Sequence, residues 1–427
     1  MEAAYYVAGI DVHKKMLAVV VANARDRELH FEGRRFGTTV SELRNLAAWL
    51  RTHDVQEVVM ESTAQYWKPV WLALEGHFQL WLAQARSNRG PRGRKTDFRD
   101  AKRSVSRLLS DDLILSYVPG AEQRGWRTLT RTKYQLTRDR VRLQSQLESL
   151  LEECQIKLSS VVSDLLGASG RRMLRAIAEG ETDPAKLRKL GDRRLRATDG
   201  ELTDALSGQP QPLHRKLLLL YLERLEVIEA QIAELESMLA EAMKAHEDAI
   251  VRLAELPGLG VDSAQQIIAE IGPAAEAFPS APQLASWVGV CPGRQESAGE
   301  STSNRSAKGN RAMRRLLNQL AHAAVRKRDC YLQVLFKRLS PRLGYAKAVW
   351  AIAHRLCRLI WKVLHDGVRY VERGPAVSAL TLKRRKQRLV TQLKKLGYSV
   401  QLSPCRGEPW THSVAACVFR GCGRENG

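Results

Sequence analysis

The 427-residue sequence lacks any run of about 18 apolar residues, the length that a membrane-spanning helix needs. Its first four residues, Met1 to Ala4, carry no basic segment followed by an apolar one, so we expect no secretory signal. Seven cysteines are scattered along the chain without the spacing of a disulfide framework, which suits a reducing compartment. We therefore expect a cytoplasmic protein with two or three domains.

Acidic residues are also scarce relative to basic ones. Lys and Arg number 68 against 46 Asp and Glu, giving a formal net charge of +22 and a pI near 10.0. A basic excess of this size favours a polyanionic partner, because neutralising phosphates releases counterions. Since no membrane span is predicted, nucleic acid is the leading partner.

Four of these few acids do not resemble solvated surface charges. Asp11 and Glu61 each follow directly on a short apolar, β-prone run, which predicts that they lie at the ends of buried strands. Asp97 and Asp100 are three residues apart at the start of a helix-compatible stretch, so they share one face. Converging carboxylates repel unless cations hold them, and Mg²⁺ prefers oxygen ligands. An unrelated set of strand-end and helix N-cap acids would show the same spacing.

The first 120 residues alternate strand and helix patterns, which predicts an α/β domain. The expected elements are two strands within Tyr5–Ala22, a helix over Ser41–Leu50, a strand over Val55–Met60, a helix over Trp67–Glu75 and a strand over Phe78–Leu82. The following segment, Arg86–Lys95, is rich in Gly, Pro and Arg, and its Arg92, Arg94 and Lys95 are candidates for nucleic-acid contacts. A mobile solvated loop would have the same composition.

The middle of the chain shows apolar residues every seven positions. The two series are Leu129, Leu136, Leu143 and Leu150, then Leu218, Leu225, Ile232 and Leu239, with a second seam at Tyr221, Ile228, Leu235 and Ala242. This spacing predicts coiled-coil helices that fold back on each other or join subunits. Two helices of an ordinary bundle are the alternative. Residues 155–212 give no clear pattern.

A third region begins near Ile250. Residues 256–272 place a Gly-rich turn before a helix, like a helix-hairpin-helix DNA-binding element, although a plain helix–helix turn fits as well. The small residues near Ser297 let the backbone approach a ligand closely. The cations beyond them are candidates for phosphate contacts: Lys308, Arg311, Arg314 and Arg315.

At these positions the sequence resembles the IS110-type transposases of bacterial insertion sequences. The N-terminal matches are Gly9-Ile10-Asp11-Val12-His13-Lys14, Met60-Glu61-Ser62-Thr63 and Lys95-Thr96-Asp97-Phe98-Arg99-Asp100-Ala101. The C-terminal matches are residues 256–272, Trp287-Val288-Gly289-Val290-Cys291-Pro292, Glu296-Ser297-Ala298-Gly299 and Lys308-Gly309-Asn310. They occur in the family's order and cover roughly residues 5–120 and 250–365.

The resemblance implies a fold class and roles that spacing alone does not give. The fold would be an α/β RNase H/RuvC-like N-terminal domain, a helical coiled-coil middle and a mostly α C-terminal domain with a helix-hairpin-helix-like element. Asp11, Glu61, Asp97 and Asp100 would bind Mg²⁺, or Mn²⁺, as a DEDD set. Ser297 would be the catalytic serine, with Ser301, Ser303 and Ser306 close by. The family usually has a basic residue after Ser-x-Gly, whereas this chain has Glu300.

The implied activity is transposition through serine attack on a DNA phosphodiester, guided by an RNA that the element encodes. Donor and target DNA, the guide RNA and a dimer or tetramer of the chain would be the partners. The resemblance also implies a bacterial, nucleoid-associated location. A RuvC-like nuclease or Holliday-junction resolvase without a covalent intermediate is the first alternative, and a non-catalytic nucleic-acid-binding protein is the second. The expected domains are 1–125 (RuvC-like), 126–249 (helical), 250–370 (serine-bearing) and 371–427 (a basic tail).

Overall fold

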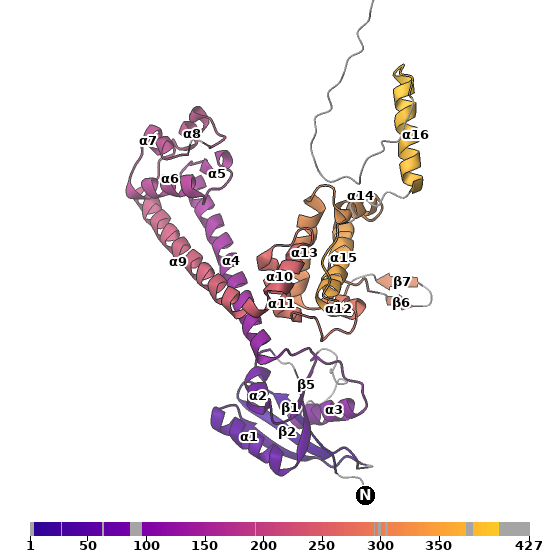
Figure 1. Ribbon diagram of the computed structural model, residues 1–427. Coiled ribbons are helices and arrows are strands. Elements are labelled where there is room, and N and C mark those ends of the chain that lie inside the picture. The colour runs from indigo at the N-terminus through magenta and orange to yellow at the C-terminus, as the bar shows by residue number, and fades with distance from the viewer. Residues whose placement is uncertain are drawn as a thin grey trace, which may run out of the picture.

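The computed structural model describes residues 4–26, 28–61, 64–85, 96–192, 194–293, 295–297, 300–303, 306–372 and 379–400. An α/β body built from the N-terminal third, a long arm of two helices and a second, helical body are visible in Figure 1. Within the described ranges, no helix combines the length and the apolar character needed to cross a membrane.

The N-terminal body contains a mixed sheet of five strands in the order β3-β2-β1-β4-β5. The strands are β1 (Tyr6–Val12), β2 (Met16–Asn23), β3 (Glu32–Gly37), β4 (Val55–Glu61) and β5 (Gln79–Ala83). β1 pairs antiparallel with β2 and parallel with β4, and β5 continues the parallel part. The predicted α/β fold is confirmed, and a RuvC-like domain has this kind of sheet.

Helices cover both faces of this sheet. Alternate residues of a strand point to opposite faces, and the two hydrophobic clusters follow that alternation. Ala8 and Ile10 pack in a cluster with α1 (Val40–Thr52) and α2 (Trp67–Leu74). Val7 and its neighbours Val20 and Val59 pack in a second cluster with α3 (Asp97–Leu109). The residues of β1 are therefore divided between two buried layers, and α3 covers the face toward which Asp11 points.

The arm consists of α4 (Ala121–Glu153) and α9 (Pro212–Ala242), which pack against each other. Leu143, Leu150, Leu218 and Leu225 of the predicted heptads are buried in one cluster. At the far end are four short helices, α5 (Leu158–Val161), α6 (Ala168–Glu179), α7 (Pro184–Lys189) and α8 (Asp199–Ala205). The two long helices thus fold back on each other, and the coiled-coil geometry itself stays a prediction.

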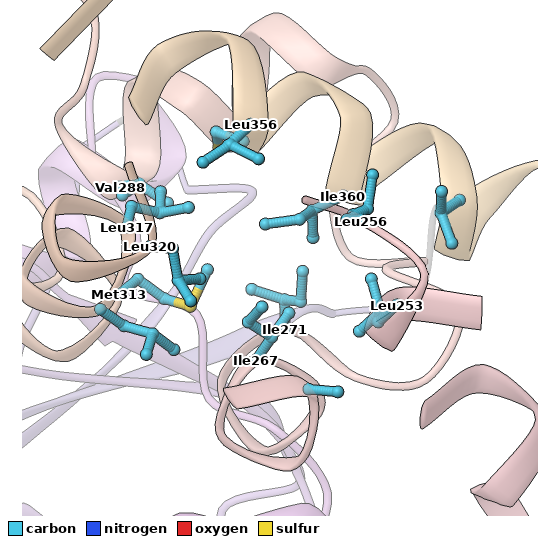
Figure 2. Close-up of a cluster of buried hydrophobic side chains, with 14 of the residues drawn as sticks. Leu253, Leu256, Ile267, Ile271, Val288, Met313, Leu317, Leu320, Leu356 and Ile360 are labelled. Carbon is cyan, nitrogen blue, oxygen red and sulfur yellow. The ribbon is translucent and has the colours of Figure 1, made fainter. Parts of the chain in front are cut away.

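The helical body follows α9 and has its own core (Figure 2). Its elements are η1 (Lys244–His246), α10 (Glu247–Ala254), α11 (Val261–Ile271), α12 (Ala281–Val288), β6 (Gln295–Ser297), β7 (Glu300–Ser303), α13 (Arg311–Arg326), α14 (Tyr331–Leu343) and α15 (Tyr345–His365). Leu253, Ile267, Leu317 and Ile360 in Figure 2 come from four different helices. The core therefore fixes α10, α11, α13 and α15 as one unit.

Four parts of the fold differ from the expectation or go beyond it. β3 and α16 (Ala379–Lys395) had not been predicted, and residues 155–212 contain the four short helices of the tip. The turn at residues 255–260 does join two helices, but Gly258 is pressed against α13, where an added Cβ would lie 2.7 Å from the Ala324 nitrogen. Packing alone accounts for this glycine, so a DNA-binding role of the turn stays a prediction, as does the division into domains.

Candidate active site

Two of the predicted acids lie at one edge of the sheet. Ile10 of β1 is in register with Met60 of the parallel strand β4, so Asp11 and Glu61 follow side by side at the carboxyl ends of adjacent strands. By the alternation along each strand, both side chains point to the face that α3 covers. The crevice beyond the carboxyl ends of such strands is the usual place for a site in an α/β sheet.

A glycine brings α3 close to this edge. An added Cβ at Gly9 would lie 2.4 Å from the Ala101 oxygen and 2.7 Å from the Val105 Cγ2. Only a residue without a side chain therefore allows α3 to pack directly on β1. Asp97 and Asp100 occupy the first turn of α3, and this close packing carries them to the end of β1, next to Asp11.

The carboxylates that meet here are poorly solvated. The side chains of Asp11 and Asp100 are only 12% and 9% exposed. Burial raises the pKa of Asp11, the negative charges of Asp100 and Asp97 raise it further, and His13 opposes the shift. Asp100 forms an ion pair with Arg103. Like charges and burial both disfavour ionisation of Asp11, so a bound cation would stabilise its charged form.

His13 also faces the acids, although the sequence had not singled it out as a site residue. Its Nε2 lies 3.2 Å from the Asp11 Oδ2 and 3.4 Å from the Asp97 Oδ1. One ligand atom from each of these residues falls within 4.8 Å of the other two, a spacing that a single metal ion can bridge. The signal in the sequence was the position of His13 two residues after a strand-end aspartate.

This donor set fits a hard divalent cation. Carboxylate oxygens are the ligands that Mg²⁺ and Mn²⁺ prefer, whereas an imidazole is a less typical ligand for either. Asp11 and Asp97 are the residues whose oxygens already converge. The charge of Asp100 acts on Asp11, and Glu61 lies beside Asp11 at the end of the neighbouring strand. His13 is suited to orient two of the carboxylates through Nε2.

The predicted nucleophile lies elsewhere. Ser297 ends β6 and pairs with Glu300 at the start of β7 in a short antiparallel hairpin. Figure 1 shows this hairpin projecting from the helical body, well apart from the end of β1 in the sheet body. The structure therefore brings the acids together but does not bring Ser297 to them within one chain.

The predicted phosphate-binding cations of the helical body differ in their exposure and in their contacts. Lys308 and Arg311 are exposed. Arg314 donates from Nη1 to the carbonyls of Gly289 (2.6 Å) and Ala307 (2.5 Å), and from Nη2 to the Ser306 Oγ. It therefore fastens the segment before α13 to the end of α12.

Arg315 is held by the arm. Its guanidinium lies 3.2 Å from the ring centroid of Tyr134, and Nη2 donates to Gln266. Arg92, Arg94 and Lys95 fall outside the described residues, so their contacts with nucleic acid stay a prediction.

A buried glutamate links these parts. Glu270 of α11 is 3% exposed and accepts hydrogen bonds from Arg131 Nε and Nη2 of α4 at 2.8 and 2.9 Å. It also accepts from the Asn310 Nδ2 at 3.0 Å, and Asn310 caps α13. The sequence had given no sign of this residue. Glu270 ties the arm to the segment that follows the serine hairpin.

Two models of known protein families match the chain. Residues 8–156 match the model of the transposase domain DEDD_Tnp_IS110, and residues 251–334 match that of the Transposase IS116/IS110/IS902 family. No curated protein matches the chain significantly. An acidic α/β domain followed by a helical transposase domain defines a DNA-transposing enzyme. The two matches together span more than half of the sequence, and the chain belongs to the IS110 family of transposases.

Proposed function

We propose that the protein excises and inserts its insertion sequence through a metal-assisted attack of Ser297 on a DNA phosphodiester. The observation that carries the proposal is that Asp97 and Asp100 of α3 meet the largely buried Asp11 at one point. Acids suit the first turn of a helix, but placing these two beside Asp11 costs stability, because like charges repel and burial disfavours ionisation. A cation bound at this point would offset that cost.

The four acids Asp11, Glu61, Asp97 and Asp100 would hold the ion, and His13 would keep two of them oriented. A bound Mg²⁺ supplies charge stabilisation to the phosphate and to the attacking and leaving oxygens. Ser297 would form the new bond from its Oγ to phosphorus while the bond to a deoxyribose oxygen breaks, and the serine proton ends on that oxygen. The energy of the phosphodiester is conserved in the protein-linked strand, so the strand can be rejoined to a new partner.

The exposed cations Lys308 and Arg311 lie on the segment that follows the hairpin and are proposed to contact the phosphates there. The high positive charge of the chain supports the binding of a second polyanion besides DNA, and the family resemblance suggests that this polyanion is a guide RNA. Base pairing would then choose the sequence while the protein reads backbone and shape. Arg92, Arg94 and Lys95 are the proposed RNA or DNA contacts of the N-terminal part.

The separation of Ser297 from the acids supports an oligomer, because two copies can supply the two halves of a site. The arm offers a surface for joining copies. Leu213, Leu220 and Val227 are spaced seven residues apart on α9 and are 65%, 51% and 56% exposed. A stripe of this spacing is not used by α4 in the same chain and is typical of a seam between helices.

The test uses purified protein, Mg²⁺, labelled donor and target DNA, and RNA transcribed from the flanks of the element. The product is a protease-sensitive protein–DNA adduct on a denaturing gel, compared for wild type, Ser297→Ala and Asp11→Ala. We expect the adduct to be lost in both variants. A Ser301→Ala variant serves as the control for a nearby serine and is expected to keep the adduct.

The second candidate is a nuclease in which water is the nucleophile. The distance of Ser297 from the acids within one chain favours it, because such an enzyme needs only the acidic edge. Cleavage without an adduct that survives Ser297→Ala but not Asp11→Ala would establish this second function and refute the serine mechanism.

A further inference from the structure

The helical body has a hollow that the proposed chemistry does not use. It has a volume of about 710 Å³ and lies between the C-terminal half of α15, residues 368–371 and the start of α12. This is within the range of about 300–1,000 Å³ that small-molecule sites occupy, large enough for a nucleotide. Its walls combine cations and aromatic rings with aliphatic side chains, among them Leu359, Val363 and Val368.

The cations form one row. Arg355, Arg358 and Lys362 line the hollow, are exposed, and are spaced three and four residues apart, so they share one face of α15. Among the residues that the structure describes, none of the three pairs with a carboxylate. Three neighbouring unpaired cations repel one another, and an anion seated between them would relieve that repulsion.

Two of the aromatic rings are held by their polar atoms. The Trp361 Nε1 donates to the Phe278 carbonyl at 2.7 Å, and the Tyr370 hydroxyl donates to the Glu372 Oε2 at 2.9 Å. Trp361 already stacks on His365, and the Arg355 guanidinium lies 5.7 Å from the ring centroid of Tyr331. Tyr331 and Tyr370 are therefore the rings with a face to offer an unpaired base, and a fixed ring stacks at little cost in conformational entropy.

The carboxylates near the hollow are already engaged. Glu255 accepts from the Arg369 Nη1 at 2.8 Å and from the Tyr370 backbone at 3.3 Å. Glu372 accepts from the Tyr331 backbone at 3.0 Å as well as from Tyr370. Both carboxylates join residues 369–372 to the helices, and within the described part of the chain neither forms an ion pair with the row of cations on α15.

Arg358 also acts beyond the hollow. Its charge opposes the rise that burial causes in the pKa of the Cys291 thiol, and Cys291 follows α12 in the chain.

We propose that this hollow, defined by Arg355, Arg358, Lys362, Tyr331 and Tyr370, binds a single-stranded nucleic-acid segment. The row of cations would contact successive phosphates, and the rings would stack on an unpaired base. A groove of cations and aromatic rings is how proteins hold single strands without reading their sequence, whereas a duplex hides the faces of its bases. The inference rests on the proposed function only in taking nucleic acid as the substrate, and it does not require the serine chemistry.

The experiment measures binding in EDTA, so that cleavage plays no part and a failure of the serine mechanism leaves the result intact. Fluorescence anisotropy is recorded over a series of salt concentrations with labelled 12-nucleotide DNA, RNA of the same sequence, an abasic DNA strand and a duplex. The groove variant is Arg355→Ala/Arg358→Ala/Lys362→Ala. The matched control is Lys337→Ala/Arg338→Ala/Arg342→Ala, which removes three exposed cations from α14 of the same body.

We expect the groove variant to bind single strands at least about tenfold more weakly and to lower the slope of log K against log salt by about 2, the value for three phosphate contacts. For the control, both the loss of affinity and the change in the salt slope are expected to be smaller. Tyr370→Leu is expected to reduce the preference for the normal over the abasic strand by about fivefold or more. Whether DNA or RNA loses more affinity identifies which strand occupies the hollow.

The proposal would be overturned if the groove variant and the control lost the same affinity for single strands. It would also be overturned if the groove variant lost as much affinity for the duplex as for the single strands. As a measurement that needs no substitution, a photoreactive 4-thiothymidine or 4-thiouridine strand is crosslinked to the unaltered protein. Crosslinks in peptides containing Tyr331 or Tyr370 support the site, and crosslinks found only in other parts of the chain refute it.

Discussion

Gly9→Ala is the substitution that most directly tests how the acidic site is assembled. The added Cβ would lie 2.4 Å from the carbonyl oxygen of Ala101, far inside any normal contact, and the obstacle is helix backbone that cannot rotate away. α3 must therefore move off β1. Overpacking of this kind costs about 1–3 kcal/mol, less than the total stability of about 5–15 kcal/mol that is typical of a domain.

The functional effect should exceed the loss of stability. Asp97 and Asp100 are in the first turn of α3, so a displacement of the helix separates them from Asp11. A shift of about 1 Å in a positioned group costs on the order of a hundredfold in rate. We expect Gly9→Ala to remain folded at 25 °C while its single-turnover DNA cleavage in Mg²⁺ falls by about that factor.

The assay pairs urea unfolding with cleavage kinetics, and Gly125→Ala is the matched control. Gly125 lies within α4 with nothing within 4 Å of an added Cβ, so alanine should stabilise the protein by about 0.5–1 kcal/mol and leave cleavage unchanged. The reasoning is refuted if Gly9→Ala cleaves DNA at the wild-type rate. It is also refuted if the loss in cleavage rate is no larger than the unfolded fraction of the variant explains.

Three further results are expected. Glu270→Gln should destabilise the protein by about 3 kcal/mol in chemical unfolding, because it leaves the largely buried Arg127 guanidinium without the carboxylate that lies 3.5 Å away. An effect below about 1 kcal/mol would contradict this. Asp11→Asn should raise the melting temperature in EDTA at pH 7, since the raised pKa of Asp11 means that its ionised form destabilises the fold above the ordinary carboxyl pKa. Mg²⁺ should stabilise the wild type and leave this variant unchanged, and the same shift in both would argue against Asp11 as a ligand. Finally, an equimolar mixture of Asp11→Ala and Ser297→Ala should regain adduct formation that neither variant shows alone, if two copies complete one site; a mixture as inactive as its components would point to a site within one chain.

The sequence was most informative where burial imposes a pattern. β1, β4 and β5 were predictable because each is an apolar run, and the strand-end position of Asp11 and Glu61 followed from those runs. β3 lacked such a signal, because Phe36 is its only buried residue and the rest is charged or small. An edge strand that is exposed on most of its length has no alternation to detect.

The site was predictable only in part. The four acids were predicted from their positions, and their role as metal ligands stays a prediction. The contact of His13 with Asp97 depends on the close approach of α3 to β1, which no local pattern encodes. Glu270 was hidden for a different reason. It lies within an otherwise apolar stretch of α11, and its partners are more than a hundred residues away on α4 and 40 residues away at Asn310. Periodicity cannot reveal a long-range polar contact.

The contacts of α4 bear on the proposed role of Ser297. Arg124 of this helix forms a bidentate pair with Glu75 of the sheet body at 2.8 and 2.6 Å, and two turns further on Arg131 forms the bidentate pair with Glu270. One helix therefore holds both bodies through charge-assisted, two-point contacts. If Ser297 is the nucleophile, a second copy of the chain can deliver its hairpin to Asp11 with both pairs intact, whereas moving the whole helical body to Asp11 within one chain would break one of them. These contacts therefore favour the proposed site between subunits over a rearrangement of the two bodies.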